Sequence, residues 1–359
     1  MSVRLVRAAW VGAVLYLAAF GVSGAVEGSI DDQVGLPHDV VEDAEAWQTF
    51  VSHAGAVSAD FGSGGQVRAA LKTGAGYEPE QLEQGEIAYG AIVALQQADF
   101  VAGLRRVADN PAQSDALARR LMDEPSAVYS IPGAEQAAGL VVARIQEQGR
   151  HLAQVGAEVK QSAYDVQHSS WSQVRDSDRV ARLSLVKKLS ATRFVAKPQD
   201  GDELRKAMAI MSQAPDPDFT RREGSPVITR ALVLASLAVL RRTDDPQTVR
   251  AVLYEPETRQ CYNLAKLNLF QCLAVAGPRY EDVFCLAEHG LKETASCVTA
   301  STHARWKGEA WESGRVAALT PIPVVAAADK VSGEPRRRGV HRAAHHGSSH
   351  GGGRHKRHA

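Results

Sequence analysis

ETRQCYNLAKLNLFQCLAVAGPRYEDVFCLAEHGLKETASC, residues 257–297, holds all four cysteines of the 359-residue chain. Residues 257–276 and 280–294 both have the composition of helices, and Gly277-Pro278 between them is typical of a tight turn. The segment therefore predicts a helical hairpin. Cys261 and Cys272 lie on its first arm, and Cys285 and Cys297 on its second.

Four cysteines allow three pairings, and helix geometry chooses among them. Cys261 and Cys272 are eleven residues apart, about 16 Å along a helix, whereas a disulfide needs Cα atoms roughly 4.4–6.8 Å apart. The same argument excludes a bridge between Cys285 and Cys297. In an antiparallel hairpin, facing residues lie symmetrically about the turn. The pairs 261/297 and 272/285 have midpoints at 279 and 278.5, so we predict Cys261–Cys297 and Cys272–Cys285.

One feature argues against the outer bridge, Cys261–Cys297. Twelve residues of α-helix leave Cys285 and Cys297 about 120° apart around the axis, which predicts that Cys297 lies at or past the end of its helix. The spacing resembles that of twin-cysteine hairpins of the coiled-coil-helix-coiled-coil-helix type, and this likeness of shape covers about 40 residues. The resemblance implies the same stapling of two helices. No Cys-x2–4-Cys unit is present, so we predict no zinc site here.

The rest of the chain predicts an all-α, multi-helix bundle. It is rich in Ala, Leu, Gln, Glu and Arg, and no run of alternating β-branched and polar residues indicates a strand. Pro79, Pro111 and Pro246 stand where first-turn prolines belong. The helices expected before the hairpin are residues 43–59, 66–72, 79–97 (with residue 109 as an alternative end), 111–123, 126–130, 134–168, 174–194, 203–213, 227–242 and 246–254.

One long helix is expected at residues 134–168. Ile145, Leu152, Val159 and Val166 recur every seven residues, and Gly149, Gly156 and Ala163 follow four positions after the first three. A seven-residue apolar repeat is typical of a coiled-coil seam, and small residues beside it let another helix approach closely. We favour one helix of a bundle. The alternative is self-association through this helix, or docking of a protein partner on it.

The N-terminus predicts export. Arg4 and Arg7 precede an uncharged apolar run at residues 8–22, and Ser23-Gly24-Ala25 supplies the small residues of a cleavage site. We therefore predict a signal peptide at residues 1–25. The alternative is an uncleaved anchor, because residues 8–26 are just long enough to span a bilayer. Both interpretations place the protein in the periplasm or outside the cell, where cysteines pair.

The charge of the chain is balanced, with 41 basic and 41 acidic residues, but it is unevenly distributed. Residues 332–359 are strongly basic and glycine-rich, so residues 313–359 are expected to be a disordered tail. Two roles are open for it. One is binding an anionic envelope polymer or lipid through Arg336, Arg337, Arg338, Arg342, Arg354, Lys356 and Arg357. The other is metal capture by His341, His345, His346, His350, His355 and His358, and a tail without a role is the third possibility.

The sequence suggests a domain plan but no reaction. Residues 26–213 form an N-terminal bundle, 214–226 a Pro- and Gly-containing linker, and 227–312 a C-terminal helical region with the hairpin. No motif for hydrolysis or phosphate binding is present, and the acids Glu78, Glu80, Glu83 and Glu86 are explained by the start of a helix. We predict a non-enzymatic exported scaffold or interaction protein, with no cofactor and no small-molecule substrate inferred. The alternatives are a metal-binding protein that uses the tail and an enzyme of unrecognised class.

Overall fold

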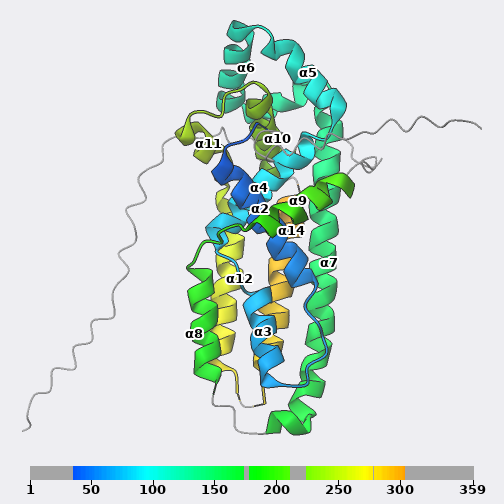
Figure 1. Ribbon diagram of the computed structural model, residues 1–359, viewed down its shortest axis with the longest axis vertical. Coiled ribbons are helices and arrows are strands. Elements are labelled where there is room, and N and C mark those ends of the chain that lie inside the picture. The colour runs from blue at the N-terminus through cyan, green and yellow to red at the C-terminus, as the bar shows by residue number, and fades with distance from the viewer. Residues whose placement is uncertain (1–34, 174–177, 211–223, 278, 304–359) are drawn as a thin grey trace, which may run out of the picture. The chain divides into compact units, whose positions relative to one another are not determined.

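Helices form every regular element of the computed structural model (Figure 1), which describes residues 35–173, 178–210, 224–277 and 279–303; none of these residues belongs to a strand. The all-α prediction is confirmed. The elements are α2 His38–Gly55, α3 Gly64–Gly74, α4 Pro79–Ala94, α5 Ala98–Ala108, α6 Pro111–Asp123, η1 Pro125–Ser130, α7 Ala134–His168, η2 Ser170–Gln173, α8 Arg179–Ser190, α9 Pro198–Ile210, α10 Pro226–Val239, α11 Pro246–Leu253, α12 Pro256–Val275, α13 Asp282–Cys285, η3 Leu286–Lys292 and α14 Glu293–Ser301.

Proline and a capping side chain define where many of these helices begin. Seven elements of the described chain start at a proline: α4, α6, η1, α9, α10, α11 and α12. Proline suits the first helical position, because the amide hydrogen it lacks would have no partner there. The side chains of Asn110, Asp245 and Glu255 accept hydrogen bonds from the next free amides of α6, α11 and α12.

The central helix of the fold is α4. Fourteen of its sixteen residues are buried, and it packs against α2, α7, α10 and α12. Glycines allow close approaches on two sides: a Cβ at Gly85 would lie 2.3 Å from the Asp43 carbonyl oxygen of α2, and one at Gly90 would lie 2.9 Å from Ala231 Cβ of α10. The expectation of one helix continuing toward residue 109 is wrong. The chain leaves the helix after Ala94 and bends by 88° into α5.

No single helix in the described ranges is both long and apolar enough to cross a membrane. Taken together, the bent pair α4 and α5 meets the criteria for a membrane span, by length and composition only.

The long helix has the predicted bounds, and its repeating face is buried within the chain. Ile145, Leu152, Val159 and Val166 are at most 2% exposed. A Cβ at Gly149 would lie 2.7 Å from Thr299 of α14, and one at Gly156 would lie 2.7 Å from Lys292 of η3. Figure 1 shows α14 running beside α7. The helix that packs closely against Gly149 and Gly156 is therefore the second arm of the chain's own hairpin.

The hairpin carries the nested disulfides that its spacing predicts. Cys261 bonds to Cys297 with their Cα atoms 5.7 Å apart, and Cys272 bonds to Cys285 with theirs 5.6 Å apart. No cysteine is free. Both bridges join α12 to the continuous helical arm formed by α13, η3 and α14, so two covalent links hold α12 to the arm that packs on α7.

A π-helical segment removes the angular offset between Cys285 and Cys297 that argued against the outer bridge. The expectation that Cys297 lies at or past a frayed helix end is wrong, because Cys297 is 3% exposed and lies inside α14. Between it and Cys285 is η3, whose seven residues follow π geometry. A π bulge adds one residue to a turn. Of the twelve residues, eleven then count toward ordinary turns, which is about three full turns at 3.6 residues each. The two cysteines consequently return to one face.

The helix predicted at residues 174–194 is shorter than expected and runs from Arg179 to Ser190. Val180, Leu183 and Val186 recur at every third position, yet Val180 is 72% exposed whereas Val186 is buried. Positions three apart drift by about 60° per step around a helix, so such a row does not stay on one face. Arg182 is buried instead, with its Nη2 atom 2.5 Å from Asp282 Oδ2 of α13. This ion pair ties α8 to the hairpin.

The described helices all belong to one compact unit. Helices on both sides of the predicted linker pack together, as α10 does on α4. Residues 211–223 of that linker, the predicted signal peptide at 1–25 and the predicted tail at 313–359 lie outside the described residues.

Candidate functional site

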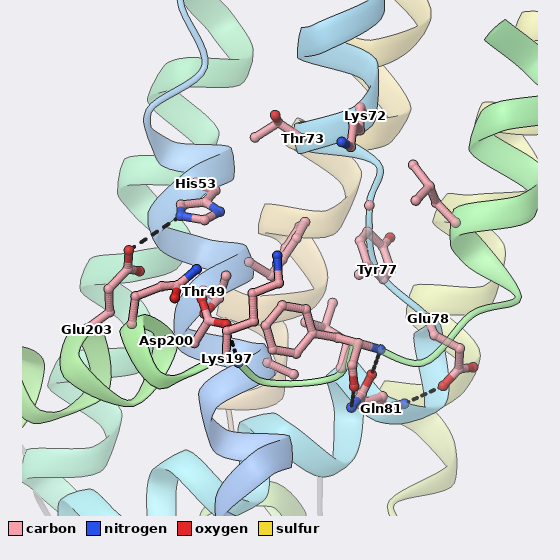
Figure 2. A pocket seen from close by; sticks show the side chains of 17 residues that line it. Thr49, His53, Lys72, Thr73, Tyr77, Glu78, Gln81, Lys197, Asp200 and Glu203 are labelled. Atoms are coloured by element: carbon pink, nitrogen blue, oxygen red, sulfur yellow. Dashed lines mark hydrogen bonds and ion pairs between the residues drawn. The ribbon is translucent and has the colours of Figure 1, made fainter.

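A pocket of about 460 Å³ opens between α2, the end of α3, the start of α4 and the chain that leads from α8 into α9 (Figure 2). Its lining mixes three kinds of side chain. The apolar ones are Ala46, Phe50, Tyr77, Leu82, Leu189 and Phe194; the charged ones are His53, Lys72, Glu78, Lys197, Asp200 and Glu203; the rest are Thr49, Thr73, Gly76, Gln81 and Gln199.

Two helix starts form one side of this pocket. Glu78 accepts hydrogen bonds from the amides of Glu80 and Gln81 and so caps α4. At the start of α9, Asp200 reaches back to the amide of Lys197 at 2.7 Å and accepts the Thr49 hydroxyl at 3.4 Å. This is the acidic half of a capping box, in which the third helical residue bonds to the cap residue. Both acids are therefore used in holding the helix ends in place.

Gln81 holds in place the segment between α8 and α9, residues 191–197, which carries Phe194 and Lys197. Its Oε1 accepts the Phe194 amide at 2.6 Å, and its Nε2 donates to the Phe194 carbonyl at 3.0 Å and to Asp43 at 3.1 Å. Asp43 is also 2.7 Å from Arg193. Burial raises the pKa of Asp43 to about 6, although the Arg193 charge acts in the opposite direction. Side-chain contacts thus attach residues 191–197 to α2 and α4.

Tyr77 forms the back wall and is fixed on three sides. Its ring meets Phe50 edge-on, with centroids 4.7 Å apart. Its hydroxyl is 2.9 Å from the Thr294 hydroxyl of α14. Lys266 Nζ lies 3.5 Å from the ring centroid and donates to the Ala75 carbonyl. Lys266 is 3% exposed, and burial holds its pKa well below the usual value. The disulfide-bonded helices therefore support the wall of the pocket.

The charged groups at the mouth are less constrained. His53 Nε2 is 3.4 Å from Glu203 Oε1, and the other Glu203 oxygen is buried with no hydrogen-bond partner. Lys72 and Lys197 contribute ammonium groups from two different segments, and both residues are exposed. In Figure 2 the Lys197 side chain extends into the space between His53 and Tyr77. At the mouth of the pocket, the ammonium groups of Lys72 and Lys197 therefore form no salt bridge with the described residues.

A second polar cluster is enclosed in the core beside α4. Glu83 and Glu86 are both 0% exposed. Glu83 accepts two hydrogen bonds from Arg259, at 3.0 and 2.8 Å, and a third from the Glu255 amide. Glu86 accepts the hydroxyls of Tyr262, at 2.7 Å, and Ser301. Burial raises the pKa of Glu83 to about 7 and that of Glu86 to about 8. This cluster joins α4 to α12 and α14.

Glu86→Gln is expected to flatten the pH dependence of stability. The folded-state pKa of Glu86 lies above its ordinary value of 4.5, so the folded protein keeps a proton that the unfolded chain releases. That stabilisation is complete below about pH 4.5 and is lost as the pH rises toward 8, at about 1.4 kcal/mol per pH unit. Glutamine mimics the protonated acid, so the variant lacks this loss.

The measurement is urea unfolding at pH 5, 6.5 and 8. Glu158→Gln, an exposed change on α7, is the control and should follow the wild-type slope. Parallel curves for wild type and Glu86→Gln would show that Glu86 is ionised in the folded protein across this range.

The predicted site residues divide into two groups. The four cysteines are brought together as predicted. The histidines and basic residues assigned to the tail lie outside the described residues, so metal and polyanion binding there stay predictions. Within the described ranges, no three His, Cys, Asp or Glu residues are placed to hold a metal ion.

The pocket residues were not foreseen. The pattern of Glu78, Glu80, Glu83 and Glu86 indicates only the start of a helix, and no motif in the sequence singles out His53. The sequence holds one usable signal, the proline at the start of α9 with an acid two residues later, which marks a helix start near residue 198.

No protein family model, no curated protein and no solved structure matches this chain. The pocket and the buried cluster are therefore interpreted from their own chemistry.

Proposed function

We propose that this chain is a non-enzymatic, exported helical binding protein that holds a small ligand in the pocket between α2, α4 and α9. The observation that carries the proposal is the pocket itself. Its volume of about 460 Å³ falls within the range of small-molecule sites, roughly 300–1,000 Å³, and its lining combines an apolar wall with a few polar groups.

The contacts within the pocket favour binding over catalysis. A hydrolytic site needs a nucleophile in hydrogen-bond contact with a base that a third group orients. His53 and Glu203 resemble a base with its orienting acid, but the nearby Thr49 hydroxyl donates to Asp200 instead. Glu78 and Asp200 are occupied as helix caps. These acids serve the shape of the pocket, which suits a protein that binds and releases a ligand.

The disulfides support the exported location. All four cysteines are paired, and such bridges persist in oxidising compartments. With the predicted signal peptide, this favours the periplasm or the cell exterior. The basic tail would then hold the protein near an anionic polymer or lipid of the envelope while the helical body binds its ligand.

Thermal unfolding in the presence of matched probes tests the proposal. The probes are phenylpropionate, phenylethylamine, phenylalanine and glucose, of which three share an aromatic body and differ in charge. Thr73→Trp places a large side chain in the pocket, whereas Ser184→Trp adds the same group on the exposed side of α8. At least one probe at 100 times its dissociation constant should stabilise wild type by about 2.7 kcal/mol.

The Ser184→Trp control should respond to the same probe as wild type does, Thr73→Trp should not, and the probe should be recovered unchanged. The proposal fails if no probe stabilises the wild type, if Thr73→Trp responds as fully as the control, or if the protein converts the probe into a product.

A further inference from the structure

We propose that the ligand of this pocket is an organic anion, with a carboxylate or phosphate head at the mouth and an apolar or aromatic body against the inner wall. This inference rests on the proposed binding function and specifies the ligand class. The structural basis is a pair of lysines, Lys72 and Lys197, that face one pocket from two different segments of the chain.

The first argument is the balance of charge that remains once the internal contacts are assigned. Glu78 and Asp200 direct their oxygens to backbone amides of α4 and α9. Glu203 faces His53 at 3.4 Å. No acid among the described residues forms a salt bridge with Lys72 or Lys197, so their charges are available to a ligand. A lysine ammonium is a compact charge with three donors, suited to carboxylate or phosphate oxygens.

The second argument is the direction of two helices. Both α4, with 16 residues, and α9, with 13, begin at this pocket. The first amides of a helix carry partial positive charge, which favours an anion over a cation nearby. The caps Glu78 and Asp200 offset part of this field. Lys72 and Lys197 add two positive charges that form no salt bridge with the described acids.

The third argument is the nature of the wall. Phe50, Tyr77 and Phe194, together with Leu82 and Leu189, line the inner surface. The rings of Phe50 and Tyr77 meet edge-on, and hydrogen bonds fix the backbone of Phe194 to Gln81. An aromatic or aliphatic ligand gains affinity by displacing water from such a wall. An inorganic anion would leave that surface wet, so the inference requires an organic body.

Calorimetric titration of the full-length protein at fixed ionic strength provides the test. Phenylpropionate and phenyl phosphate carry the two candidate heads, inorganic phosphate lacks the body, and phenylethylamine reverses the charge. At least one aryl anion should bind at least tenfold more tightly than inorganic phosphate and than the amine. The stronger of the two identifies the head as carboxylate or phosphate.

The variants Lys72→Gln and Lys197→Gln should each weaken that anion about fivefold or more. Both residues are exposed, so folding should be unaffected. Arg150→Gln, which removes an exposed cation of α7 that does not line this pocket, should leave affinity within twofold. Tighter binding of the amine, or unchanged anion affinity in both lysine variants, overturns the anion assignment and leaves pocket binding standing. Failure of every probe, glucose and phenylalanine included, removes the proposed function as well.

Discussion

Removing both disulfides is expected to cost the protein most of its stability. Each bridge closes a loop in the unfolded chain, with sequence separations of 13 for the inner one and 36 for the outer one. In the chain-entropy model these loops correspond to about 3 kcal/mol for the inner bridge and about 4 kcal/mol for the outer one taken alone, and the outer bridge adds less while the inner one is present. A loss of about 4–6 kcal/mol approaches the whole stability of many domains.

Alanine is the suitable replacement, because Cys285 and Cys297 are 1% and 3% exposed and a serine hydroxyl there would need a partner. The variants are Cys272→Ala with Cys285→Ala, Cys261→Ala with Cys297→Ala, and the fourfold change. Urea unfolding of each is compared with wild type in reductant. Reduced wild type should match the fourfold variant within about 1 kcal/mol. Wild-type stability in the fourfold variant would show that the packing of α12 and α14 needs no covalent link.

The second large effect is expected at the ion pair between α8 and the hairpin. Arg182 and Asp282 are each 1% exposed and their charged atoms lie 2.5 Å apart, while the Arg182 guanidinium also lies 4.9 Å from the Tyr280 ring. Arg182→Leu leaves the Asp282 charge buried with fewer donors. Truncating one partner of a buried pair typically costs about 3–5 kcal/mol.

A matched comparison lies on the neighbouring surface. Arg68 and Asp178 are 3.0 Å apart, but their side chains are 44% and 61% exposed, so Arg68→Ala should cost at most about 1 kcal/mol. The double variant Arg182→Leu with Asp282→Leu should recover part of the loss, because it removes the buried charge as well. Equal effects of Arg182→Leu and Arg68→Ala would mean that the buried pair is solvated in solution.

The sequence predicts the fold best where one local rule dominates. Prolines and caps locate the starts of α6 and α11, and the seven-residue repeat identifies the buried face of α7. The cysteine pairing follows from helix rise and the symmetry of one turn. Gly149 and Gly156 correctly indicate a close helix partner, and the structure shows that this partner is α14 and η3 of the same chain.

The sequence predicts least where tertiary packing overrides a local preference. Nothing in Leu286–Lys292 marks a π segment, which is stabilised by two bridges and by packing on α7. Glu83, Glu86 and Arg182 belong to residue types that are almost never fully buried without a partner, so periodicity assigns them to the surface. The pocket joins segments from Ala46 to Glu203, and its lining depends on side-chain contacts such as Gln81 with Phe194.

Non-reducing peptide mapping of protein recovered from its own cells tests the stapled, exported helical body most directly. Trypsin cuts after Arg259, Lys266, Arg279 and Lys292, which places each cysteine on its own peptide. Residues 260–266 should be linked to 293–305, residues 267–279 to 280–292, and the first peptide should begin at Val26. Four free thiols, or a link between the peptides of Cys261 and Cys285, would contradict the hairpin and the oxidising compartment on which the proposed function depends.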